Sequence, residues 1–302
     1  MSKLSLSGVY APIPTPFDAD GAVAHDRLAE NIARWNQTPL AGLVVLGSNG
    51  EYVYLSDQEK LEVLKTARQA IPKDKLFIAG TGCESTRCTL KLTEQAAAIG
   101  ADAAVVITPS YYTSRMDAAA MRRHYLELAE RSPLPILIYN MPAFTGIDLS
   151  AATVVELAQH PNIVGIKDSS GNVVKLGDII RAAPSDFNVL AGSASFLYPA
   201  MVLGAVGAVA ALANIAPEQC HRIYRYALEG RHKEARQLQL KMIPPNTAVT
   251  ARFGVPGLKQ ALDWSGYYGG PSRSPLGPLD EAQQAALRAI LVEGGILASS
   301  GI

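Results

Sequence analysis

Eight short apolar segments, most of them followed by a helical pattern, recur along the first two thirds of the chain. They consist mainly of Val, Ile, Leu and Ala, without the alternation of polar and apolar residues that a half-exposed strand shows. Strands that are apolar throughout are typical of parallel sheets, because helices cover both faces. We predict strands at residues 8–13, 42–46, 76–79, 103–107, 136–139, 163–167, 188–191 and 208–210.

Helical patterns separate these strands. One begins at Ser56, which Glu59 follows three residues later, the spacing of a capping box. The predicted helices cover residues 56–70, 86–99, 117–131, 150–159, 173–182 and 196–203. Alternating strands and helices indicate an α/β fold, and a count of eight strands favours a closed (β/α)8 TIM barrel over an open doubly wound sheet. No glycine-rich nucleotide-binding sequence opens any of the helices.

The last part of the chain carries more helix than a barrel needs. Helical patterns cover residues 217–229, 232–243, 254–265 and 279–293. We therefore predict a barrel core at 1–216, followed at 217–302 by the last barrel helix and a C-terminal helical extension. No linker separates the two parts, so we expect them to form one structural unit.

The composition limits the partners. Apolar residues make up 48% of the 302 residues and charged residues 18%, with a formal net charge of zero. This balance supports a large core and gives no basic surface for nucleic acid. The longest apolar run, 200–216, is interrupted by glycines and does not indicate a membrane span. Three cysteines and the absence of a signal-peptide pattern favour the cytoplasm, with a small molecule or a second copy as partner.

Lys167 ends the sixth predicted strand, directly after four apolar residues. In a TIM barrel the active site lies at the carboxyl ends of the strands. An amine partly removed from water loses its preference for the charged form and becomes a better nucleophile, so it can form a Schiff base with a carbonyl compound. A lysine that extends from a strand end into solvent is the more common case, and Lys167 alone does not decide between the two.

Polar groups at other strand ends strengthen the reactive interpretation. Tyr139 ends the fifth strand, and its phenol could relay protons. Ser48 and Asn49 follow the second strand in a Gly-Ser-Asn-Gly turn whose hydroxyl and N–H groups could bind a carboxylate. Taken singly, Tyr139 is equally consistent with a core tyrosine, and Ser48 and Asn49 are more typical of an ordinary turn. The prediction rests on their joint placement at one end of the barrel.

Other candidate residues give weaker signals. Cys83 and Cys88 have no second pair, and the five histidines are scattered, so we expect no metal site. His124, next to Arg122 and Arg123, is predicted to lie on a solvated helix face.

Three motifs carry a resemblance to a known family. They are Gly47-Ser-Asn-Gly-Glu51, Tyr139-Asn-Met-Pro142 with Thr145-Gly146, and Gly165-Ile-Lys-Asp-Ser169. With them the chain resembles, over essentially its whole length, the class I pyruvate-dependent aldolases that include dihydrodipicolinate synthase and N-acetylneuraminate lyase. The sequences at 80–86, 190–194, 211–214, 252–259 and 266–271 are most similar to the 4-hydroxy-2-oxoglutarate aldolase branch.

The resemblance implies a role for each site residue. Lys167 would be the Schiff-base lysine and Tyr139 the proton relay, and Ser48 and Asn49 would hold the substrate carboxylate. No cofactor is implied, because the substrate forms a covalent imine with the lysine.

The resemblance also implies a homotetramer, a dimer of dimers, that acts on pyruvate or a 2-oxo acid containing it. Tyr111 would reach across an interface into the neighbour's site, with Tyr112 adjacent. Gly192 and Val209 would offer carbonyl groups near the substrate, and Ser169 would contact its distal part.

Phe144 is the departure that decides the branch. Dihydrodipicolinate synthases carry an arginine at this place, which binds the carboxylate of the aldehyde, and a phenyl ring cannot make that contact. Cys88 and Ser110 likewise replace residues of the lysine-feedback site. With Ser169, Ser193 and Ala194, Phe144 indicates a small or weakly charged distal group.

The expected activity is therefore cleavage of a 4-hydroxy-2-oxo acid, with 4-hydroxy-2-oxoglutarate giving pyruvate and glyoxylate. Dihydrodipicolinate synthase and a 2-oxo-3-deoxy sugar acid aldolase are the alternatives. A third alternative is a barrel without catalytic activity that senses sugar acids. The presence of Lys167, Tyr139 and Ser48 together disfavours it.

Overall fold

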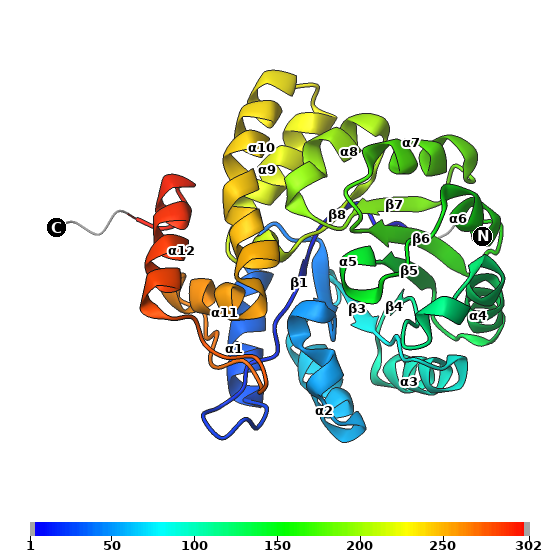
Figure 1. Cartoon of the computed structure of the whole chain (residues 1–302), viewed down its shortest axis with the longest axis horizontal. Helices are drawn as coiled ribbons and strands as arrows, with labels where there is room; N and C mark the ends of the chain where they lie inside the picture. The colour runs from blue at the N-terminus through cyan, green and yellow to red at the C-terminus, as the bar shows by residue number, and fades with distance from the viewer. Residues whose placement is uncertain (1–3, 299–302) are drawn as a thin grey trace.

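Eight parallel strands close into a single ring in the computed structural model, which describes residues 4–298. Each strand pairs with the next along the chain, and β8 pairs with β1 (Figure 1). The strands are β1 (Gly8–Pro12), β2 (Gly42–Val45), β3 (Leu76–Gly80), β4 (Ala103–Ile107), β5 (Ile136–Asn140), β6 (Ile163–Asp168), β7 (Asn188–Ala191) and β8 (Gly207–Val209). All eight predicted strands are present, and the prediction of a TIM barrel is confirmed.

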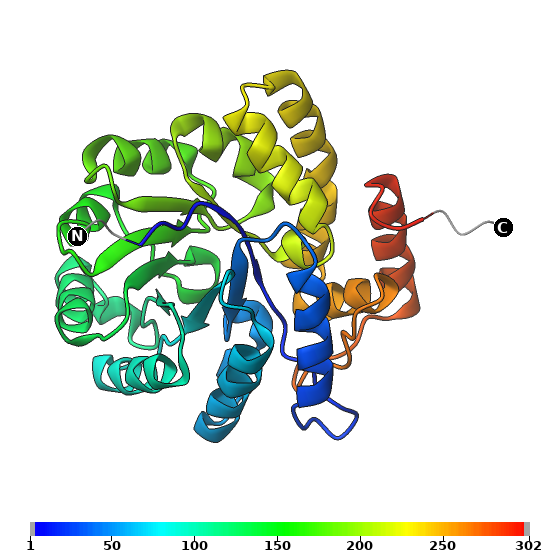
Figure 2. The same ribbon diagram turned by 180° about the vertical axis from the view of Figure 1, so that it is seen from behind.

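Helices surround the ring on its outside, as the two opposite views show (Figures 1 and 2). They are α1 (His25–Asn36), α2 (Asp57–Ala70), α3 (Thr86–Ile99), α4 (Ala118–Arg131), α6 (Ala151–Leu157), α7 (Val173–Ala182), α8 (Leu197–Leu203) and α9 (Pro217–Leu228), whereas the short α5 (Pro142–Thr145) lies at the mouth of the ring. The capping box at α2 is confirmed: Ser56 Oγ accepts from Glu59 N at 3.2 Å, and Ser56 N donates to Glu59 Oε2 at 2.8 Å.

Two of these helices were not predicted. Helix α1 begins after Ala24, which offers no side-chain cap, so its start lacks the usual sequence signal. Its buried face, with Leu28, Ile32 and Trp35, has helical spacing and was the available sign. The single-turn helix α5 follows β5 and places Phe144 near the mouth of the barrel.

The helix predicted to end at residue 243 continues through two prolines, so that prediction was wrong. Helix α10 (His232–Thr247) includes Pro244 and Pro245, and a π-helical segment, Ala248–Arg252, follows it. A proline inside a helix removes one N–H donor and crowds the carbonyl four residues earlier, which favours an irregular turn. We call Ala248–Arg252 the π segment.

The C-terminal helices complete the chain. Helix α9 packs against α8 and α10, and α11 (Gly254–Trp264) follows the π segment. Helix α12 (Glu281–Glu293) lies at the outer edge of the molecule, in red in Figure 1. Residues 1–3 of the predicted barrel core and residues 299–302 of the predicted C-terminal extension lie outside the residues that the structure describes. No helix within residues 4–298 has the length and apolar character needed to cross a membrane.

Two apolar clusters form the core. The larger one fills the layer between the strands and the outer helices. The smaller one fills the inside of the ring, and its buried members are Leu6, Tyr10, Val44, Ile78, Ala103, Val105, Leu137, Tyr139, Val164, Leu190 and Val209. Tyr139 therefore faces the barrel interior at the end of β5, which positions its ring toward the mouth.

Candidate active site

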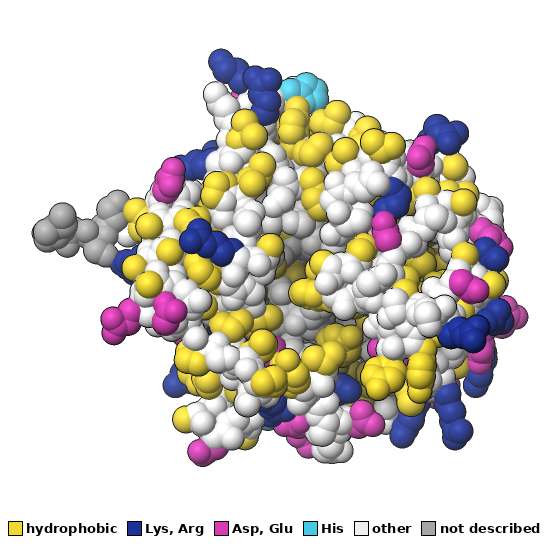
Figure 3. Space-filling model, viewed as in Figure 1, with side chains coloured by type: hydrophobic (Ala, Val, Ile, Leu, Met, Phe, Trp, Pro, Cys, Tyr) yellow, Lys and Arg dark blue, Asp and Glu magenta, His cyan; other side chains and the backbone are white. Residues whose placement is uncertain are grey.

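A pocket of about 270 Å³ opens at the carboxyl ends of the strands. Figure 3 shows this face hollowed near its centre. Nine of the predicted site residues line the pocket: Ser48, Asn49, Tyr139, Phe144, Lys167, Ser169, Gly192, Ser193 and Val209. The barrel thus brings together residues as far apart in the sequence as Ser48 and Val209.

Lys167 lies against Tyr139 in this pocket. The two residues are register partners on the neighbouring strands β5 and β6, so both side chains face the same way. Lys167 Nζ is 3.7 Å from the centroid of the Tyr139 ring, and the lysine is 4% exposed. The amine is therefore shielded from bulk water and lies over the face of the Tyr139 ring.

The surroundings of Lys167 differ from those of the other buried lysines. In the described part of the chain, Lys167, Lys175 and Lys259 are buried. Lys175 pairs with two aspartates and Lys259 with a glutamate. No carboxylate of residues 4–298 lies within ion-pair distance of Lys167 Nζ, which instead borders the pocket. A buried lysine without a carboxylate partner is suited to act as a nucleophile.

The turn after β2 has an unusual backbone. Ser48–Gly50 form a 3-10 turn; Leu46, just before the motif, and Glu51, its last residue, have φ values of 61° and 52°. Non-glycine residues seldom adopt this left-handed conformation, and such residues cluster at functional sites. Asn49 Nδ2 donates to Pro12 O at 3.1 Å, which leaves one of its two amide hydrogens for the pocket.

Ser193 is oriented by a residue that the sequence did not point to. Its Oγ accepts from Asn246 Nδ2 at 2.9 Å and from Ser195 N at 3.3 Å. With both lone pairs engaged, the hydroxyl hydrogen is left to donate into the pocket. Asn246 lies in the last turn of α10, and no local motif marked it.

The π segment and the start of α11 form a wall of the pocket that sequence reasoning missed. Its lining residues are Val249, Thr250, Ala251, Gly254 and Val255. These residues lie beyond residue 243, where we predicted that the helix ends, or at the start of the next predicted helix, and none of them was predicted to line the site. Thr250 Oγ1 donates to Asn246 O at 2.6 Å, so the hydroxyl offers only lone pairs to a ligand.

A much smaller cavity of about 10 Å³, room for about one water molecule, adjoins Ser48 and Tyr139. Tyr52, another residue not predicted, lines it, and burial raises the pKa of this phenol to about 12. Tyr52 therefore stays neutral at physiological pH.

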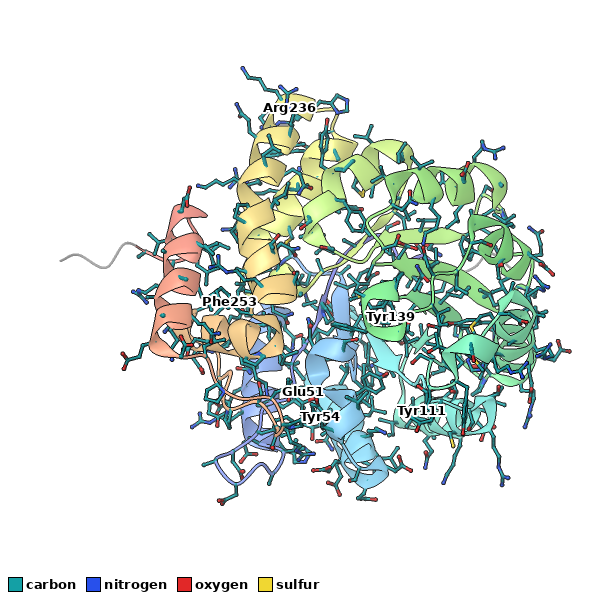
Figure 4. All side chains as sticks on the ribbon, in the orientation of Figure 1. Glu51, Tyr54, Tyr111, Tyr139, Arg236 and Phe253 are labelled. Carbon is teal, nitrogen blue, oxygen red and sulfur yellow. The ribbon has the colours of Figure 1, made fainter. Side chains whose placement is uncertain are left out.

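Tyr111 and Tyr112 lie outside the pocket of this chain. They are 79% and 70% exposed, and their rings pack edge to face with the ring centroids 5.1 Å apart. Figure 4 places Tyr111 toward the outer edge near α3, away from Tyr139. Glu84 accepts hydrogen bonds from the backbone N–H groups of Ser110 and Tyr111, both at 2.8 Å. The predicted role of Tyr111 at an interface stays a prediction.

His124 is buried, so its predicted place on a solvated helix face was wrong. It is 5% exposed, and its Nδ1 lies 2.9 Å from Thr86 Oγ1. Burial lowers the pKa of His124 to about 4. Its neighbour Arg123 is exposed, so the two residues lie on different faces of α4. Within residues 4–298, no group of three or more His, Cys, Asp or Glu side chains is placed to hold a metal ion.

Known proteins resemble the chain throughout. A family model described as the dihydrodipicolinate synthetase family matches residues 5–293. A protein of Emericella nidulans named "Probable 4-hydroxy-2-oxoglutarate aldolase, mitochondrial" is 36% identical, with 93% of this chain and 92% of that protein covered. A 4-hydroxy-tetrahydrodipicolinate synthase of Natronomonas pharaonis is 33% identical, with 97% and 99% covered.

A solved structure has the same fold. It is the chloride-inhibited dihydrodipicolinate synthase of Acinetobacter baumannii in complex with pyruvate. The TM-score is 0.92 at 33% sequence identity, and the match covers 97% of this chain and all of the other.

Proposed function

Because the chain belongs to the dihydrodipicolinate synthetase family, we propose that it is a Schiff-base aldolase for a 4-hydroxy-2-oxo acid. Membership in the family makes it an enzyme of the class I pyruvate aldolase and lyase type. The substrate that we propose is 4-hydroxy-2-oxoglutarate, which is cleaved to pyruvate and glyoxylate. The observation that carries the proposal is the buried, carboxylate-free Lys167 over the ring of Tyr139.

The proposed reaction begins with attack of Lys167 Nζ on the 2-oxo carbon. The carbinolamine loses water to give a protonated imine, with Tyr139 relaying protons to and from the oxygen. The imine draws the electrons of the C3–C4 bond, the C4 hydroxyl loses its proton, and the aldehyde leaves. The enamine that remains takes up a proton at C3, and hydrolysis releases pyruvate.

Neutral donors hold the substrate in this proposal. Ser48 and Asn49 bind the carboxylate next to the reacting carbonyl, and the free hydroxyl hydrogen of Ser193 serves the distal part of the substrate. Lys167 is the one charged side chain among the described residues that line the pocket. A small distal group fits a lining of this kind better than a large charged one.

The reaction as proposed uses the covalent lysine imine and no cofactor. We further propose a cytoplasmic homotetramer, in which the exposed Tyr111 and Tyr112 lie at an interface between copies. A large exposed aromatic pair of this kind is typical of a protein contact.

A synthase activity is the second candidate, and the name of the Natronomonas pharaonis relative favours it. Glyoxylate carries its carboxylate directly on the aldehyde carbon, whereas the aspartate semialdehyde that such an enzyme condenses with pyruvate carries a carboxylate two carbons further out. Phe144, at the pocket mouth, supplies no cation for that group. A 2-oxo-3-deoxy sugar acid aldolase shares the first steps and differs only in the aldehyde.

Borohydride trapping tests the proposal. Incubation with pyruvate and borohydride should add one pyruvyl group to the peptide that contains Lys167, and the Lys167→Ala variant should take up none. Pyruvate release from 4-hydroxy-2-oxoglutarate is then compared with pyruvate consumption in the presence of aspartate semialdehyde. Absence of the adduct in the wild-type enzyme would rule out the mechanism, and consumption without release would favour the synthase.

A further inference from the structure

A polar network lies directly behind the two reactive residues. Asn140 follows Tyr139 and Asp168 follows Lys167, and the two are again register partners on β5 and β6. Because side chains alternate along a strand, they point away from the barrel interior. Both are fully buried, and Asn140 Nδ2 donates to Asp168 Oδ2 at 2.9 Å. One side-chain hydrogen bond therefore joins the strands immediately beyond the reactive pair.

Lys175 closes this network into a ring. From α7, its Nζ lies 2.8 Å from Asp168 Oδ2 and 2.5 Å from Asp148 Oδ1. Asp148 Oδ1 also accepts from Asn140 Nδ2 at 2.8 Å. Each of the four side chains thus contacts two others, and the ring ties the loop after β5, the end of β6 and the start of α7 together.

The remaining polar atoms of the two strand residues are also engaged. Asn140 Oδ1 accepts from Leu149 N at 2.9 Å, and Asp168 Oδ1 accepts from Ser170 N at 2.9 Å. The buried members Asn140, Asp168 and Lys175 are held rigidly, because any displacement leaves a buried polar group unpaired, whereas the Asp148 side chain is half exposed. Replacing a buried ion pair with apolar side chains of similar volume is often neutral for stability. The network's distinct property is therefore the fixed geometry that it imposes on both strand ends.

We propose that Asn140, Asp168 and Lys175 are positioning residues that fix the separation between the Lys167 amine and the Tyr139 phenol. This inference rests on the proposed imine chemistry. The relay must reach the nitrogen and oxygen of each intermediate, and a misplacement of about 1 Å at such a site lowers a rate by about 10²-fold. The three side chains act through the strand ends and do not enter the pocket.

Two variants and a control test the network in the full chain. Asp168→Asn keeps the size of the side chain and removes its charge. The double variant Asp168→Leu with Lys175→Met removes the ring but leaves no buried unpaired charge. Ile179→Ala, one turn further along α7, is the control, since it removes a buried apolar side chain without touching the network. Trapping with pyruvate and borohydride, read by intact mass, counts the competent sites per chain.

We expect turnover per trapped site to fall about 10-fold in Asp168→Asn and about 10²-fold in the double variant, with KM for 4-hydroxy-2-oxoglutarate nearly unchanged. Ile179→Ala should unfold at a lower temperature and keep the wild-type rate per trapped site. Wild-type turnover per trapped site in either network variant would overturn the inference. Failure of the wild-type enzyme to form an adduct would instead overturn the proposed function, and this inference with it.

Discussion

Lys259 Nζ lies 2.6 Å from Glu51 Oε1 in an ion pair whose side chains are both 1% exposed. The same ammonium donates to Pro271 O at 2.8 Å, and Glu51 Oε2 accepts from Arg273 N at 2.8 Å. Glu51 directly follows the turn Ser48–Gly50 and holds a left-handed backbone. The pair therefore fastens the proposed carboxylate-binding turn to α11 and to the loop behind it.

Replacing Lys259 with Met should destabilise the protein and loosen this turn. Glu51 would remain as a buried charge without its partner, which costs about 3–5 kcal/mol of unfolding free energy. Urea unfolding measures this loss, and KM for 4-hydroxy-2-oxoglutarate should rise as the turn relaxes. Adding Glu51→Gln should restore part of the stability. Unchanged stability in the single variant would show that the pair does not hold the turn.

Glu59 and Arg273 give a pH-dependent contribution to stability. The guanidinium donates to both carboxylate oxygens, at 2.6 and 3.0 Å, and these hydrogen bonds lower the pKa of Glu59 to about 2. Because the folded pKa is lower than the unfolded value, the contribution is complete above about pH 4.5 and is lost as the pH falls toward 2. Urea midpoints of Arg273→Gln should therefore fall less than those of the wild type over this window. An equal fall of the urea midpoint with pH in the two proteins would contradict this contribution of Glu59.

Tyr139→Phe should lower the proposed turnover about 10²–10⁴-fold, the usual contribution of one general acid–base group. Tyr125→Phe is the matched control, because that buried phenol donates to Val106 O at 2.9 Å and lies outside the pocket. We expect the control to lose about 1 kcal/mol of stability and no activity. Stopped-flow measurement of pyruvate release compares the turnover of Tyr139→Phe with that of Tyr125→Phe. Equal rates of release in the two variants would remove Tyr139 from the mechanism.

Phe144→Arg should shift the choice of aldehyde. Phe144 lines the pocket and is 69% exposed, so an arginine can be accommodated there and its guanidinium can reach a distal carboxylate. Consumption of pyruvate with aspartate semialdehyde should rise relative to the wild type. The measured quantity is the ratio of kcat/KM for the two substrates, with Phe144→Leu as control. A ratio that is the same in all three proteins would mean that this position does not select the aldehyde.

The strands and most of the pocket could be predicted from the sequence because both follow from local patterns. Apolar runs mark the parallel strands, and the barrel geometry then gathers whatever polar residues end them, Lys167 and Tyr139 included. Helix α1 escaped prediction because Ala24 gives no cap. The prediction that His124 is exposed relied on its sequence neighbours, which are arginines. Adjacent residues of a helix point in directions about 100° apart, so a buried residue can directly follow an exposed one.

The wall formed by the π segment could not be derived in this way. Two adjacent prolines normally end a helix, and only the tertiary structure shows that α10 continues past Pro245 and then widens. The orientation of Ser193 by Asn246 is likewise a contact between residues 53 positions apart, which no local signal reports.

The π segment has a consequence for how such an enzyme changes. It contributes no backbone hydrogen bond to the ring of strands, whereas Lys167 and Tyr139 belong to that ring. Ala251, which is exposed and lines the pocket, can thus be exchanged without shifting the amine, so that a lineage can accept a new aldehyde while its nucleophile stays in place.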